Sequence, residues 1–223
     1  MTERGHQGGP VMGLPSQSMP EHLSASTFDD FVASRPEGET WELIDGLFVM
    51  QATPTIPHSV IASNIERLLN DALANVLPDL LACREVTIVM EAAGIVGGGN
   101  YVPDVAVLDE ADLQEGLTST ATCHLAVEVV SPSDRKPIAG SARPKIDIKL
   151  EGYRNLPSCM AILVVDQSEI AVMALIRTDQ GWIESRYDSP DDEIALPDFG
   201  LKCKVADIYF RTPALRTASK IAP

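Results

Sequence analysis

The chain has 223 residues, of which 45% are hydrophobic and 22% are charged. These values are typical of a globular protein and exclude a largely disordered one. The 32 acidic residues outnumber the 17 basic ones, which gives a net charge of −15. A protein that wraps nucleic acid with an extended basic surface is therefore not indicated.

Membrane and secretory segments are not indicated either. The sequence contains no run of about 18 uncharged apolar residues, and its N-terminus has no apolar core of a secretory signal. The four cysteines are too far apart for a zinc motif. We therefore expect a cytoplasmic protein with reduced thiols and no membrane partner.

One folded domain between two tails is predicted. Residues 1–24 are rich in Gly, Pro, Ser and Met without periodicity, and residues 211–223 look similar. We therefore expect tails over 1–24 and 211–223 and a single domain over 25–210.

Helices and strands are predicted in mixed order along this domain. In chain order they are a helix at 26–33, a hairpin at 41–50 turning at Asp45-Gly46, a helix at 58–77, strands at 86–90, 101–108 and 125–130, a helix at 144–154, a hairpin formed by 161–165 and 170–177, and edge strands at 181–187 and 193–196. Strands outnumber helices, which favours an α/β (α+β) domain with a mixed β-sheet flanked by helices and an N-terminal β-hairpin.

Two carboxylates stand out because they lie among apolar residues. Asp104 lies in YVPDVAVL and Glu128 lies in LAVEVV. An acid on a buried strand needs a compensating partner or a cation. Two such acids on adjacent strands can share one divalent ion, and their oxygen atoms suit magnesium or manganese. A buried glutamate paired with an arginine is the structural alternative.

A basic segment follows Glu128. Six basic and two acidic residues lie between Arg135 and Arg154, a local balance of +4 in an acidic chain. By itself, such a cluster is more typical of a solvated loop and helix face than of a binding site.

Several short motifs then occur in a fixed order. They are WELIDG at 41–46, His58 at the start of a helix, PDVAVL at 103–108, AVEVVSPS at 126–133 and KLEGYRNLPSCMAILVVD at 149–166. In this combination the chain resembles the Uma-type putative restriction endonuclease family, a domain of unknown function assigned to the PD-(D/E)XK nuclease superfamily. The resemblance covers about residues 26–210 and implies a restriction-endonuclease-like core.

The resemblance also implies a site. Asp104 matches the acid of the PD element and Glu128 that of the (D/E)XK element. Together with the backbone carbonyl of Val129 they would hold Mg²⁺ or Mn²⁺. Glu42, in the first hairpin, matches a recurrent family glutamate and would add a third acid. His58 also recurs, although a helix-start or packing role suits it better.

The lysine of the motif is displaced. Val130 stands where the superfamily pattern has a lysine. Members of the family commonly carry this lysine on the following helix, four residues before a tyrosine, and Lys149 and Tyr153 have that spacing. The family then implies that Lys149 places the attacking water or neutralises charge on the phosphate.

A metal-dependent endonuclease acting on DNA is the leading hypothesis. The net charge predicts weak, salt-dependent DNA binding, and a homodimer would bring two basic segments together. A nuclease fold that has lost catalysis and serves as a binding or assembly module is the alternative. A hydrolase of smaller phosphate esters is a third possibility. Catalysis requires Asp104, Glu128 and Lys149 to converge.

Overall fold

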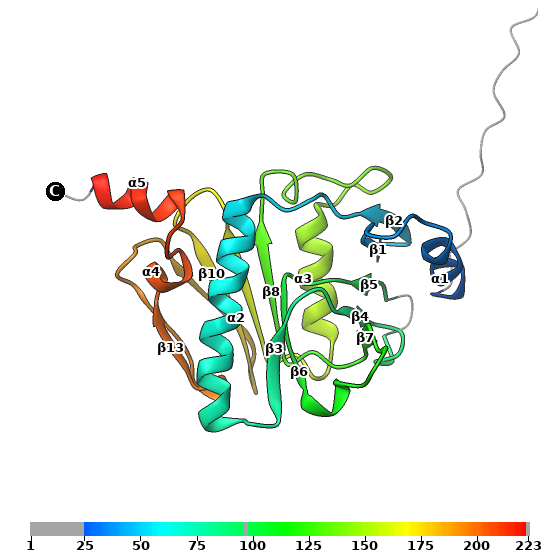
Figure 1. Ribbon diagram of the computed structural model, residues 1–223, viewed down its shortest axis with the longest axis horizontal. Helices are drawn as coiled ribbons and strands as arrows, with labels where there is room; N and C mark the ends of the chain where they lie inside the picture. The colour runs from blue at the N-terminus through cyan, green and yellow to red at the C-terminus, as the bar shows by residue number, and fades with distance from the viewer. Residues whose placement is uncertain (1–24, 96–97, 222–223) are drawn as a thin grey trace, which may run out of the picture.

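A six-stranded mixed sheet lies at the centre of the protein in the computed structural model, which describes residues 25–95 and 98–221 (Figure 1). The tail expected over residues 1–24 lies outside these described residues. The strand order is β11-β10-β9-β8-β6-β3, with β8 and β9 parallel and the other neighbours antiparallel. The strands are β3 (Leu80–Cys83), β6 (Val105–Asp109), β8 (Leu125–Val130), β9 (Ala161–Asp166), β10 (Val172–Thr178) and β11 (Gly181–Tyr187).

A smaller five-stranded sheet has the order β2-β1-β5-β4-β7. Its strands are β1 (Trp41–Ile44), β2 (Leu47–Met50), β4 (Thr87–Val89), β5 (Asn100–Tyr101) and β7 (Ser119–Thr120). β1 and β2 form the predicted N-terminal hairpin. Asp45 and Gly46 at its turn have φ of 54° and 72°, the left-handed pair that a two-residue turn between twisted strands requires.

Helices pack on both faces of the six-stranded sheet (Figure 1). The described helices of the whole protein are α1 (Ala25–Ala33), α2 (Ile56–Val76), α3 (Lys145–Asn155), α4 (Val205–Ile208) and α5 (Pro213–Ile221). Of these, α2 and α3 lie on opposite faces of β8. Leu125, Val127 and Val129 of β8 belong to the apolar cluster that includes α2. Ala126 and Val130, on the other face, belong to the cluster that includes α3. The fully buried β8 therefore has a helix on each side, as expected for a central strand.

The clearest sequence signal, the helix of 58–77, corresponds to α2. Thr55 caps it by accepting a hydrogen bond from the His58 backbone N–H at 3.3 Å, and Pro57 occupies its first turn. The buried side of α2 repeats at three and four residues and consists of Ile61, Ala62, Ile65, Leu69 and Leu73.

The tail expected from residue 211 is instead partly helical. α5 begins at Pro213, and the Thr212 hydroxyl accepts a hydrogen bond from the Leu215 backbone N–H at 3.4 Å. Ala214 is buried against the α2 cluster. A capping threonine followed by proline is a local start signal, and the polar composition of the segment concealed it.

The edge strand expected at 193–196 forms β12 (Glu193–Leu196). β12 pairs with β13 (Leu201–Lys204) as a separate hairpin. Short 3₁₀ turns at Glu110–Asp112 and Pro197–Phe199 complete the described elements.

The strand expected over 101–108 is interrupted. β5 ends at Tyr101 and β6 begins at Val105. Pro103 has no N–H to donate to a ladder. The Val102 backbone N–H donates to Glu42 and its carbonyl accepts from Lys149. Side chains from β1 and α3 thus replace strand pairing at this point.

No helix within the described ranges is long and apolar enough to cross a membrane. The four cysteines are all free thiols.

Candidate active site

The two acids singled out from the sequence lie opposite each other on neighbouring strands. Val105 of β6 pairs with Val127 of β8 in antiparallel register, so Asp104, one residue before, lies across from Glu128. The Asp104 backbone N–H donates to the Val127 carbonyl at 2.9 Å. The Asp104 carboxylate accepts the Val129 N–H at 2.6 Å. Cross-strand neighbours of this kind have Cβ atoms about 5 Å apart, so the two carboxylates share one small region.

Helix α3 supplies the groups that contact Glu128. Lys149 and Tyr153 are one helical turn apart and therefore face the same side. Lys149 Nζ lies 2.6 Å from Glu128 Oε1. The Tyr153 hydroxyl donates to the same oxygen at 2.7 Å. Among the described residues, Glu128 Oε2 is therefore the oxygen open to a further ligand.

Glu42 on β1 extends this network. Its side chain is completely buried, and its Oε1 accepts the Val102 N–H at 2.9 Å and lies 2.9 Å from Lys149 Nζ. Its Oε2 lies 2.6 Å from Lys145 Nζ. Lysines and glutamates thus alternate from the edge of α3 inward, in the order Lys145, Glu42, Lys149 and Glu128.

All three hydrogens of the Lys149 ammonium have partners. Besides the two glutamates, it donates to the Val102 carbonyl at 3.0 Å, and only 1% of the side chain is exposed. Lys149 therefore compensates the charge of two buried carboxylates in this structure. Its ammonium group contacts Glu128 from inside the fold and is not exposed to solvent.

Burial and charge shift the pKa values within this network in opposite directions. Burial alone would raise the pKa of Glu42, but the ammonium groups of Lys149 and Lys145 lower it to about 2. Burial raises the pKa of Glu128 to about 7; Lys149 opposes this rise, whereas Asp104 adds to it. Burial would lower the pKa of Lys149, but the two glutamates raise it. Lys149 is therefore charged at neutral pH.

His58 contacts the second acid. Its Nε2 lies 2.8 Å from Asp104 Oδ1, and the two side chains are 17% and 24% exposed. Burial would lower the pKa of His58, but the hydrogen bond to Asp104 and the nearby carboxylates raise it. The sequence favoured a helix-start role. His58 does lie in the first turn of α2, and that turn also brings it to Asp104.

The chemistry of these groups fits a hard divalent cation. Asp104 and Glu128 offer carboxylate oxygens. The Val129 carbonyl points to the same side of β8 as the Val129 N–H, which donates to Asp104. Within the described ranges, no three His, Cys, Asp or Glu side chains are grouped to hold a metal by themselves. A cation here would therefore need water and phosphate as further ligands, as Mg²⁺ commonly does.

The basic segment of 135–154 is largely neutralised by the protein itself. Lys145 and Lys149 pair with buried glutamates. Arg143 pairs with Glu151, and Arg135 lies 3.0 Å from Asp166. Most of the local positive charge thus compensates nearby acids, and an extended basic surface does not result.

Replacing Glu42 by glutamine should change how stability responds to acid. The pKa of Glu42 is lower in the folded protein, so its ionised form stabilises the fold above about pH 4.5, and this contribution is lost as the pH falls toward 2. We expect Glu42→Gln to lower the free energy of unfolding at pH 7 by on the order of 3 kcal/mol. The difference from wild type should shrink between pH 5 and pH 3 in urea unfolding. The exposed Glu37→Gln is the control. A difference independent of pH would contradict the ionised state of Glu42.

Comparisons with known proteins show the family and the fold of the chain. A family model described as "Uma2: Putative restriction endonuclease" matches residues 27–206. A crystal structure of a putative nuclease belonging to DUF820 from Anabaena variabilis is similar with a TM-score of 0.59 and 17% identity, covering 81% of this chain and 96% of that chain. No curated protein matches the sequence. The structural match confirms the expected mixed sheet flanked by helices.

Proposed function

Because the chain belongs to the Uma2 family, we propose that it is a metal-dependent endonuclease that hydrolyses phosphodiester bonds in DNA. One observation carries the proposal. Glu128, which lies across from Asp104, is held by Lys149 Nζ at 2.6 Å. Glu128 thus lies across from a second acid and contacts an amine from the next helix.

Each residue of the site would have a separate role in this reaction. Asp104, Glu128 and the Val129 carbonyl would hold Mg²⁺ or Mn²⁺, which when bound lowers the pKa of a water molecule and stabilises charge on the phosphate. Lys149 fixes the Glu128 carboxylate and supplies positive charge behind it. His58 holds the Asp104 carboxylate from the opposite side. The exposure of Asp104 and His58 leaves this end of the site open to substrate.

A catalytically inactive binding or assembly module is the second candidate. The enclosure of Lys149 favours it, because all three ammonium hydrogens are engaged within the fold. An amine held in this way does not reach a phosphate oxygen without rearrangement. The two candidates differ in one result, which is metal-dependent cleavage.

DNA binding should be weak. The net charge of −15 repels a phosphate backbone, and the pairing of Lys145, Lys149, Arg143 and Arg135 leaves little free positive charge on the basic segment. A homodimer would double the available contacts to the phosphate backbone.

A cytoplasmic location is part of the same proposal, and the free thiols are compatible with it.

Nicking of supercoiled plasmid tests the proposal. Purified protein should convert the plasmid to open circles with Mg²⁺ or Mn²⁺ at low salt, and the conversion should stop with a chelator and fall steeply as salt rises. Protein carrying Glu128→Gln, purified identically, reports contaminating nucleases. Absence of cleavage with both metals would favour the binding module, and equal cleavage by both proteins would identify a contaminant.

A further inference from the structure

A row of four side chains crosses the six-stranded sheet on the face that α3 covers. Glu128 pairs with Val164, Val164 with Met173, and Met173 with Arg186, on successive strands from β8 to β11. Register partners share a face, and strands lie about 4.8 Å apart. The row therefore extends roughly 14 Å from the candidate catalytic acid to the edge of the sheet.

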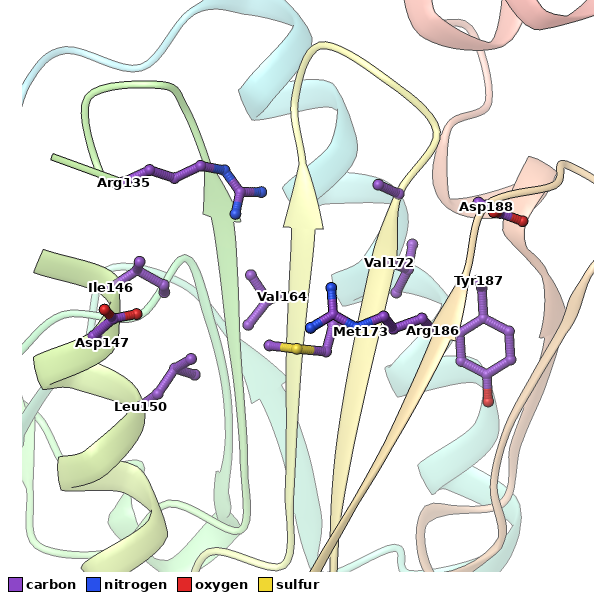
Figure 2. Close-up of a pocket in the computed structure, with 11 residues that line it drawn as sticks. Arg135, Ile146, Asp147, Leu150, Val164, Val172, Met173, Arg186, Tyr187 and Asp188 are labelled. Carbon is purple, nitrogen blue, oxygen red and sulfur yellow. The ribbon is translucent and has the colours of Figure 1, made fainter. Parts of the chain in front are cut away.

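A cavity of about 410 Å³ lies over the middle of this row (Figure 2). Val164 and Met173 contribute its floor, and Ile146 and Leu150 of α3 form an apolar wall. The volume lies within the range of small-molecule sites. Because Val164 is the direct neighbour of Glu128, the cavity begins one strand away from the proposed cleavage site.

Charged groups surround the apolar floor. Figure 2 shows the Arg186 guanidinium over Met173 and that of Arg135 above the end of β8, with the Asp147 carboxylate on the α3 side. Arg135 is held by Asp166 at 3.0 Å and Arg186 by Glu184 at 2.7 Å. A guanidinium has five N–H donors, so each arginine keeps donors for a ligand.

We propose that this cavity binds the base of one unpaired nucleotide that flanks the phosphodiester held at Asp104 and Glu128, an inference that rests on the proposed function. A nucleobase is flat and apolar on its faces but carries donors and acceptors on its edge. The apolar floor and α3 wall suit its faces. The arginines suit its acceptors or the adjoining phosphate, and Asp147 suits an amino group.

The acidic body of the protein supports the same substrate class. Binding along duplex DNA draws most of its strength from many phosphate contacts, which this surface does not offer. Enclosure of a single base draws on apolar contact and a few hydrogen bonds instead. The preferred substrate is therefore DNA with an unpaired nucleotide, such as a single strand or a distorted duplex, and not an intact duplex.

Binding without metal tests the cavity apart from cleavage. In the presence of a chelator, a short labelled single strand should bind more tightly than the blunt duplex of the same sequence in fluorescence anisotropy. Filling the cavity with Met173→Trp and removing a donor with Arg186→Gln should each weaken single-strand binding about tenfold. The matched control is Arg67→Gln on α2, which removes an arginine that pairs with Asp71 and should change binding less than about twofold.

The methyl group of Met173 gives a direct readout in the unaltered chain. With methyl-labelled methionine, the Met173 signal, assigned from Met173→Leu, should shift on addition of the single strand. The exposed Met50 on β2 serves as the reference signal. This measurement remains decisive if Met173→Trp fails to fold.

The outcomes separate this inference from the proposed function. A Met173 shift together with weaker binding by Arg186→Gln supports the cavity, even if the plasmid is never nicked. Tighter binding of the duplex, or an unshifted Met173 signal with unchanged binding by Arg186→Gln, overturns it, even if nicking is observed.

Discussion

Replacing Lys149 by methionine is expected to lower the free energy of unfolding at pH 7 by about 3–5 kcal/mol. The ammonium group is the shared partner of Glu42 and Glu128, at 2.9 and 2.6 Å, and its side chain is 1% exposed. Methionine fills much of the same volume but leaves the two carboxylates in an apolar environment without this charge. Urea unfolding at pH 7 measures the loss.

Two further variants show whether charge or packing is responsible. Lys145→Met removes a lysine that is 15% exposed and contacts only one of these glutamates, Glu42, so we expect a smaller loss. Combining Lys149→Met with Glu42→Gln removes one of the two acids that lose the Lys149 ammonium. The double variant should therefore be more stable than Lys149→Met alone. A loss below about 1 kcal/mol for Lys149→Met, the value of an exposed ion pair, would contradict the buried network.

Local pattern accounts for the parts of the fold that the sequence predicted. The hairpin of β1 and β2 follows from Asp45-Gly46 between strand-forming residues, and α2 follows from apolar spacing after a capping threonine. β8 is recognisable because six apolar-dominated residues suit a strand buried on both faces. In each case the determining signal lies within a few neighbouring residues.

Distant side chains account for one failure of the sequence-based prediction, and short local patterns account for two others. The strand expected over 101–108 breaks because Glu42 and Lys149, 60 and 47 residues from Val102, occupy its backbone groups. Within the segment itself, only Pro103 indicates that the strand is interrupted. β13 and α5 were missed because their amphipathic patterns are short and their segments are polar on one side.

The candidate site divides in the same way. Apolar surroundings singled out Asp104 and Glu128, the family resemblance added Lys149, and strand register explains why the two acids lie opposite each other. The pairing of His58 with Asp104, 46 residues apart, has no signal in spacing. Charge counting also misjudged the basic segment, because a count does not distinguish a free lysine from one that compensates a buried glutamate.

Asparagine at position 104 is expected to reduce metal-dependent cleavage by about a hundredfold or more. Asn has nearly the same shape as Asp, and its side-chain oxygen can still accept the Val129 N–H that Asp104 accepts at 2.6 Å. The side-chain NH2 group of the asparagine can donate a hydrogen bond to His58 Nε2 when the imidazole is neutral and carries its proton on Nδ1. The fold should therefore stay intact, while the negative charge required by a hard cation is lost.

The same variant separates loss of the ion from loss of the fold. Calorimetric titration with Mn²⁺ should show weaker binding by Asp104→Asn, and its urea unfolding midpoint should stay close to that of wild type. Asp109→Asn is the matched control: Asp109 lies on the same strand and pairs with His124 at 3.1 Å, so Asp109→Asn should retain both cleavage and Mn²⁺ binding. Unchanged cleavage by Asp104→Asn would remove this carboxylate from the proposed mechanism, because Glu128 and the Val129 carbonyl would then have to hold the cation with a single charged ligand.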